Sequence, residues 1–272
     1  ARALAVDAAR VYYGDSDDDG VYSIDKHGGQ PLRIARHAPV SGALSLDGGF
    51  ITWIASPGDA VLQAPIRGGQ QPKTVRAGGI FSGLAAVGDD VFIAEAIGSG
   101  GALLRVTGAT ASRVAAFDGP PRTVLADKTH AIIVTPTRIF RTPHERGELE
   151  TIATGTRFTH AALDDAFIYV VADLDRARAI LRFPKSGGAM MVVARDVRDA
   201  PINVDGGEVF FFDATRPQVR SAPFAGGASR VVAEDEGLTT VSALQADGEA
   251  VYVAEGVHET GAIVAIPRAI PR

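Results

Sequence analysis

The sequence predicts an all-β protein built from seven consecutive copies of one four-stranded unit. Short runs rich in Val, Ile and aromatic residues alternate with Gly, Pro and Asp along the whole chain. Residues 202–233 show the unit most clearly, with four such runs joined by an Asp-Gly turn, a polar loop and a Gly-Gly turn. The amphipathic helical stretches that helical solenoids of similar period require are not found.

The repeat has a regular period. The Asp that ends the first run of each copy, or its equivalent, recurs in steps of 40, 40, 40, 37, 41 and 42 residues, at Asp7, Asp47, Val87, Asp127, Asp164, Asp205 and Asp247. Four strands in each period of about 40 residues are typical of a β-propeller blade. We therefore predict a seven-bladed β-propeller with four antiparallel strands per blade. The blades begin near residues 4, 44, 84, 124, 161, 202 and 244, in a single domain over residues 1–272.

Each run suits one position in a blade. The first run is short and apolar at alternate positions, as expected for the innermost strand, and the second is apolar on both faces, as expected between two neighbouring blades. The third run is closed by proline in five copies, where the ladder needs no further N–H group (Pro65, Pro143, Pro184, Pro223 and Pro267). Four Gly-Gly pairs supply positive φ for the turn into the outer strand (Gly28-Gly29, Gly68-Gly69, Gly187-Gly188 and Gly226-Gly227). The outer strand carries charged residues, which protect its exposed edge from pairing with another chain.

Composition excludes several classes of function. The net charge is −5 at pH 7 and no run of Lys and Arg exceeds two residues, so we expect no nucleic-acid partner. No apolar stretch is long enough to span a bilayer. The chain contains no cysteine, which excludes disulfides and thiolate metal sites.

The last repeat stops at IVAIPRAIPR without a clear fourth run, and the first begins abruptly at ARALAVD. Either residues 269–272 supply the outer strand of the last blade, or a segment upstream of Ala1 does. The abrupt start favours the second alternative, so we expect the chain to be part of a longer protein.

One motif resembles a known family. Tyr12-Tyr13-Gly14-Asp15 and the degenerate versions at 169–173, 210–213 and 252–255 resemble the YWTD repeat of low-density-lipoprotein-receptor-type propellers, in particular that of bacterial secreted or lipoprotein-type propellers. The resemblance covers essentially the whole chain and implies a binding scaffold with no particular reaction. It also implies that the acidic residue ending the second run ties one blade to the next (Asp15, Glu95, Asp173, Asp213 and Glu255). Ala55 and Pro136 depart from this pattern.

The segment from Asp15 to Gly20 matches the pattern D-x-D-x-D-G, in which alternating carboxylates converge on a hard cation. It predicts a Ca²⁺ site with Asp15, Asp17 and Asp19 as ligands, the one cofactor that we consider. An EF-hand would need Glu where Lys26 stands, and an integrin-type hairpin loop would need an acid where Ser23 stands. The alternative is a solvated acidic turn. No other repeat contains this pattern.

The histidines show no local pattern of a metal site, and no nucleophile elbow, phosphate loop or dinucleotide fingerprint is present. We therefore expect a non-catalytic scaffold that binds a protein partner, as part of a larger extracytoplasmic protein or assembly in the periplasm, on the outer membrane as a lipoprotein, or secreted. The alternative is a propeller-class enzyme, a lyase or lactonase, which would need a metal or a His/acid cluster at the central channel. His160, Asp164 and Asp205 are its candidate members, and His258 is a further polar loop histidine.

Overall fold

The computed structural model describes residues 3–15, 20–37, 39–145, 147–213, 215–236, 238, 240–255 and 262–268. Within these ranges the regular structure consists of β-strands alone, and no helix that could cross a membrane is present. The chain divides into two compact units, which we call the first unit, up to Thr154, and the second unit, from Gly155. The single-domain organisation stays a prediction.

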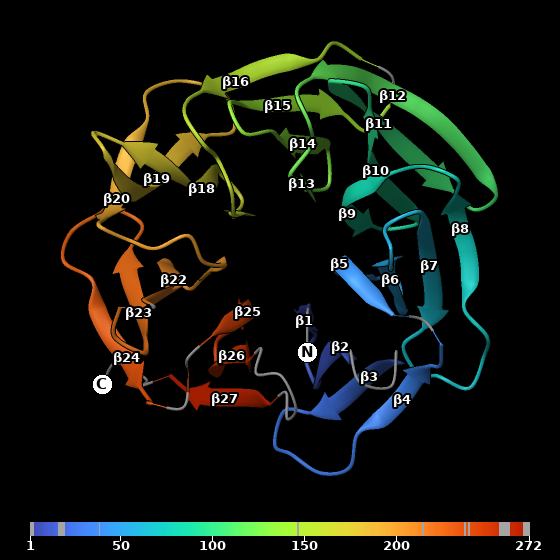
Figure 1. The fold of residues 1–272 in the computed structure, drawn as a ribbon, viewed down its shortest axis with the longest axis horizontal. Coiled ribbons are helices and arrows are strands. Elements are labelled where there is room, and N and C mark those ends of the chain that lie inside the picture. The colour runs from blue at the N-terminus through green and yellow to red at the C-terminus, as the bar shows by residue number, and fades with distance from the viewer. Residues whose placement is uncertain are drawn as a thin grey trace. The chain divides into compact units, whose positions relative to one another are not determined.

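The first unit contains four antiparallel sheets of four strands, in each of which successive strands lie side by side (Figure 1). The strands are β1 (Leu4–Val6), β2 (Arg10–Asp15), β3 (Gly20–Asp25) and β4 (Leu32–Ala35); β5 (Val40–Asp47), β6 (Phe50–Ala55), β7 (Ala60–Pro65) and β8 (Lys73–Ala77); β9 (Phe81–Val87), β10 (Asp90–Ile97), β11 (Gly100–Thr107) and β12 (Thr110–Asp118); and β13 (Thr123–Ala126), β14 (His130–Val134), β15 (Arg138–Pro143) and β16 (Glu150–Thr154).

The second unit contains two sheets of four strands and, among its described residues, a last sheet of three. Its strands are β17 (Ala161–Leu163), β18 (Phe167–Leu174), β19 (Ala177–Pro184) and β20 (Met191–Arg195); β21 (Ile202–Asp205), β22 (Glu208–Asp213), β23 (Gln218–Pro223) and β24 (Arg230–Glu234); and β25 (Val241–Ala246), β26 (Ala250–Glu255) and β27 (Ile263–Pro267).

Seven successive meanders of this kind confirm the predicted fold class, a seven-bladed β-propeller. Three innermost strands begin earlier than the sequence predicts, at Val40, Phe81 and Val241 in place of residues 44, 84 and 244. In each of the three, the pairing register shifts between the early residues and the rest of the strand. The prediction followed the apolar alternation, which starts only after the shift.

The core of each unit lies between neighbouring sheets. The second strand of each sheet has four or more consecutive buried residues in most copies, as in β14, β18, β22 and β26. Trp53 and Phe210 are fully buried and belong to clusters that combine residues of two successive sheets. The predicted Gly-Gly pairs all have positive φ, and the predicted prolines all end their strands.

The repeated Asp caps the turn between the first two strands. In the fifth blade, Asp164 Oδ1 accepts the N–H groups of Ala166 and Phe167 at 2.7 Å, and Asp164 Oδ2 accepts the hydroxyl of Tyr169 at 2.7 Å. Asp7 and Tyr12 repeat this arrangement in the first blade. Burial, followed by the bond to Asp164, raises the pKa of Tyr169. These Asp residues therefore act as structural caps.

The innermost strands are sheet edges, and polar side chains satisfy them. Ser45 Oγ accepts the N–H of Ala86 at 2.9 Å, and Asn203 Oδ1 accepts that of Ala246 at 3.0 Å. In both cases the side chain belongs to one innermost strand and the N–H to the next one along the chain, so a backbone donor that would otherwise lack a partner is paired.

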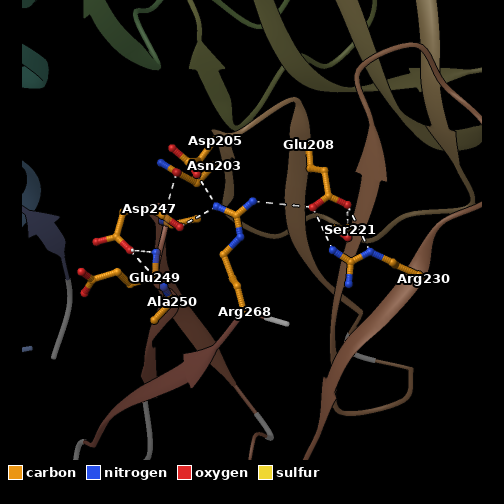
Figure 2. A network of polar contacts seen from close by, with 10 residues as sticks. Asn203, Asp205, Glu208, Ser221, Arg230, Asp247, Glu249, Ala250 and Arg268 are labelled. Atoms are coloured by element: carbon orange, nitrogen blue, oxygen red, sulfur yellow. Dashed lines mark hydrogen bonds and ion pairs between the residues drawn. The ribbon is translucent and has the colours of Figure 1, made fainter. Parts of the chain in front are cut away.

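A charged network joins the last two sheets of the second unit (Figure 2). Arg268, just after β27, bonds Asp205 in the turn of the preceding sheet and lies 3.7 Å from Glu208. The guanidinium stacks 4.7 Å from the ring centre of Phe210, and its side chain is only 14% exposed. Glu208 also pairs with Arg230 at 2.8 Å and accepts the hydroxyl of Ser221 at 2.9 Å.

The Asp164–Tyr169 bond can be tested by Tyr169→Phe, which removes one hydroxyl and little volume. Because that hydroxyl bonds a carboxylate at a buried position, we expect a loss of about 1 kcal/mol in the free energy of unfolding. Chemical denaturation monitored by circular dichroism measures it. Tyr22→Phe is the matched control: its hydroxyl bonds Arg33 at an exposed site and should contribute much less. Equal effects of the two substitutions would contradict the capping role.

Arg268→Ala should lower the melting temperature more than Arg230→Ala, because the Arg230 side chain is 51% exposed and contacts Glu208 only at the surface. Burial raises the pKa of Glu208, but its bonds to Arg230 and Ser221 and the charges of Arg230 and Arg268 outweigh this and lower the pKa. A lowered pKa gives stability that is present above the ordinary pKa and is lost as the pH falls through the folded value.

The difference in melting temperature between wild type and Arg268→Ala should therefore narrow as the pH falls below 4.5, the ordinary pKa of Glu. Differential scanning calorimetry from pH 7 downward measures it. A difference that stays constant over this range would argue against a contribution from the ion pairs.

Candidate functional site on the loops of the fifth blade

Three loops of the second unit meet at one end of the sheet β17–β20. We call residues 155–160, 174–177 and 195–199 the blade-5 loop face. Thr156 forms a bridge with Asp173 at the end of β18, and the N–H of Thr159 bonds the carbonyl of Val171 at 3.0 Å. The N–H of Val197 bonds the carbonyl of Arg178 at 3.2 Å. Backbone pairing thus places all three loops beside one another.

Arg178 directly follows the loop 174–177 and bonds the other two loops. Its Nη1 donates to Asp173 Oδ1 at 2.9 Å and to the carbonyl of Arg157 at 3.2 Å. Its Nη2 donates to Thr159 Oγ1 at 2.7 Å and lies 2.6 Å from Asp199 Oδ1. The side chain is only 13% exposed, so these charge-assisted contacts are largely shielded from water. Arg178 is thus the central organising residue of this face.

Asp199 is the acidic partner of both Arg178 and His160. Burial raises its pKa, but the hydroxyl of Thr159 and the charges of Arg178 and His160 outweigh this and hold the pKa below its usual range. His160 Nε2 lies 3.6 Å from Asp199. Burial lowers the pKa of His160 and so does Arg178, against the opposing effect of Asp199. At neutral pH this face therefore holds an ionised carboxylate, a fixed guanidinium and a neutral imidazole.

The backbone of this face is strained. Four of the five non-glycine residues with positive φ in the described structure belong to it: Arg157 (54°), Asp175 (50°), Arg176 (70°) and Asp196 (56°). Asp175 and Arg176 form the two-residue turn between β18 and β19, where two positive φ angles suit a primed hairpin turn. The second position of that turn normally favours glycine. Arginine there costs about 1 kcal/mol of backbone strain, a cost that is common at functional sites.

This strained frame displays arginines to solvent. Arg157, Arg176, Arg195 and Arg198 are all exposed. Arg157 and Arg195 lie 3.8 and 3.6 Å from carboxylates of the same face, Asp199 and Asp175. Within the described ranges, Arg176 and Arg198 have no ion-pair partner, so their guanidinium groups are available to a ligand.

The predicted Ca²⁺ site lies mostly outside the described residues. Asp15 ends β2, where it pairs with Gly20 across the hairpin, while Asp17 and Asp19 fall in a segment that the structure does not describe. In the described part of the chain, no three His, Asp or Glu side chains gather where they could hold a metal ion. The Ca²⁺ site stays a prediction.

The candidate members of an enzyme site do not come together. His160 precedes β17, whereas Asp164 follows it, so the two lie at opposite ends of this strand. Asp205 is the last residue of β21, at the end of the strand that corresponds to Asp164, and it pairs with Arg268. Asp164 is occupied by its turn and by Tyr169. His258 lies outside the described residues.

The acidic residues that the resemblance assigns to ties between blades make local contacts where the structure shows them in detail. Asp173 pairs with Arg178 of the next strand in its own sheet. Asp213 accepts the N–H and hydroxyl of Thr215 in the following loop. Other side chains bond the neighbouring sheet: Ser45 and Asn203 of the innermost strands, Arg268, and also Lys73 and Arg105, which donate to the carbonyls of Gly108 and His144.

The sequence did not identify Arg178 as the organising residue of the blade-5 loop face. Arg178 and Asp199 are 21 positions apart, and neither belongs to a motif. The one local signal was Asp175-Arg176 between two long apolar runs, at a turn where glycine is usual.

Comparisons with known proteins support the fold alone. No known protein family matches the sequence, and no curated protein matches it. A solved structure of a nidogen/laminin complex matches with a TM-score of 0.56 and 16% identity, over 73% of this chain and 82% of that chain. The matched chain is a propeller of the YWTD type. A computationally designed protein, Ika8, matches with a TM-score of 0.66 and 13% identity, over 98% of this chain and 96% of that chain.

The role of Arg178 can be tested by Arg178→Met, which keeps most of its length and removes its charge. We expect trypsin to cleave the loops after Arg157, Arg195 and Arg198 about tenfold faster. Without the contacts of Arg178, local opening of these loops costs less free energy, so the cleavable open state is more populated. Mass spectrometry of the early fragments locates the cuts. Arg182→Met is the matched control on the same strand, since Arg182 stacks on Phe167 instead. Unchanged cleavage of Arg178→Met would contradict the organising role.

Proposed function

We propose that this chain is a non-catalytic binding scaffold that docks a protein partner on the blade-5 loop face. The observation that carries the proposal is the combination of strained backbone and exposed charge. Asp175 and Arg176 occupy left-handed positions, and the exposed guanidinium of Arg176 has no ion-pair partner within the described chain. The hairpin turn itself favours these positive φ angles, but arginine in place of glycine at the second position adds strain without adding a contact in the described chain. This strain supports a role in binding.

The charges of this face define the partner's chemistry. Arg176 and Arg198 offer unpaired cations, and Arg157 and Arg195 share loose pairs that a stronger acceptor can replace. Since the chain as a whole carries a net charge of −5, cations grouped on one face favour one orientation of an approaching partner. We propose that the partner presents carboxylates to this face.

The fold is compatible with such a role. The matched propeller was solved in a complex named for two proteins, nidogen and laminin, which supports protein binding as a use of this architecture. The resemblance to lipoprotein-type propellers supports an extracytoplasmic location, within a larger protein or assembly.

The proposal predicts opposite effects of Arg176→Gly on stability and on binding. Glycine relieves the left-handed strain, so the melting temperature should stay the same or rise, while partner binding should weaken by about tenfold because a cation is lost. Quantitative affinity capture from the native source compares wild type, Arg176→Gly and the double variant Arg176→Glu/Arg198→Glu.

Arg67→Gly is the control, because Arg67 is an exposed arginine of the first unit outside this face. A partner should be retained by wild type and by Arg67→Gly and lost with the double variant. Identical retention by all four proteins would refute the proposed docking face.

A further inference from the structure

The last sheet of the chain differs from the other six at its outer edge. In the other six sheets the third strand pairs with an outer fourth strand, whereas β27 is the end of its sheet in the described residues. All six outer pairs share one irregularity. The register shifts directly after the same position of the third strand, which is Val21, Val61, Leu103, Ile139, Ile180 or Val219.

The outer strand has a constant chemistry at this shift. The residue that the register skips is Val or Ile in all six sheets: Ile34, Val75, Val114, Ile152, Val193 and Val232. The next residue, which pairs with the third strand, is Ala in five sheets and Arg76 in the other. A Val or Ile followed by a small residue is therefore the side-chain pattern that fits this edge.

The outer strand buries its neighbour completely. The six residues that precede the shift, from Val21 to Val219, are each 0% exposed. Ile263 holds the same position in β27, because Pro267 pairs with Ala250 as Pro223 pairs with Glu208, yet Ile263 is only half-buried. The same contrast holds two residues further along the third strand. Ser23 and Ser221 are 0% exposed at this position in the first and sixth sheets, whereas Ala265 is exposed at this position in β27. The edge of β27 thus keeps apolar surface that the other sheets cover.

The backbone of this edge is suited to accept a strand. The N–H of Arg268 bonds the carbonyl of Glu249, and the N–H of Glu255 bonds the carbonyl of Ala262, so the even-numbered residues of β27 face β26. By alternation, the N–H and C=O groups of Ile263 and Ala265 face outward. β27 carries no charged residue that would protect it from pairing.

In the described part of the chain, no segment with the matching chemistry is left over to cover this edge. Every Val-Ala or Ile-Ala pair there lies in a strand that is already paired within a sheet.

We propose that the outer edge of β27 binds an extended segment of a protein partner, which adds to the last sheet as its antiparallel fourth strand. The segment carries Val or Ile followed by Ala or another small residue, placed to cover Ile263. Main-chain bonds to Ile263 and Ala265 supply affinity, and the β-branched side chain supplies specificity. This site is separate from the blade-5 loop face and does not depend on it.

The fourth strand of the preceding sheet provides a probe. A fluorescent peptide of residues 228–235, ASRVVAED, should bind the full chain in anisotropy titrations. The same peptide with Val232→Asp should bind at least about tenfold more weakly, because a carboxylate replaces the apolar side chain. Absence of binding by the unmodified peptide would overturn the proposal.

Ala265→Pro removes one outward N–H at an edge position where proline is tolerated, and it should weaken binding of the peptide by about tenfold. Ala265→Ser keeps the N–H and should bind like wild type. Melting curves of both variants establish that they fold. Equal binding by wild type and Ala265→Pro would place the peptide elsewhere and overturn the proposal.

Amide hydrogen exchange at Ile263 and Ala265 identifies the occupant. Fast exchange in the free monomer and protection by the peptide support a partner strand. Protection in the free monomer would show that the chain closes its own blade. Protection that rises with protein concentration, together with a dimer mass, would show that a second copy occupies the edge. Either of these last two results overturns the proposal of a partner strand.

Discussion

The structure depends on covering sheets that are apolar on both faces. The central strands β14, β18, β22 and β26 each bury four or five consecutive residues, on both faces, so no single sheet could remain folded in water without neighbours. Stacking successive sheets within each unit removes this apolar surface from water. Each repeat of the sequence forms one sheet, but that sheet is stable only when it packs against a neighbouring sheet.

Stacking leaves two polar problems, which local chemistry solves. Each innermost strand is an edge, and Ser45 and Asn203 pair the N–H groups that such an edge exposes. The turn at the end of that strand needs partners for its N–H groups, and in four blades the repeated Asp supplies two of them (Asp7, Asp127, Asp164 and Asp247). Tyr12 and Tyr169 bond the second carboxylate oxygen of Asp7 and Asp164. Where Asp205 lacks a tyrosine partner, Arg268 of the next sheet takes that place.

A rigid scaffold of this kind leaves its loops free to vary. On the blade-5 loop face the chain uses this freedom to hold Arg178 among three loops and to display arginines on a strained backbone. The repeat also acts as an internal standard, because a position occupied in the same way six times makes the seventh informative. Ile263 is notable only by comparison with six fully buried equivalents.

The sequence by itself determined the number of blades, the order of strands and the turns, because alternation, Gly-Gly pairs and terminal prolines act over a few residues. It also placed Asp164 and Asp205 in structural turns. Only the tertiary structure decided that Asp199 reaches Arg178 and that Ile263 is only half-buried where its six equivalents are fully buried. Those relations join residues that are distant in the chain or compare separate sheets, and they arise when sheets pack, which no local pattern records.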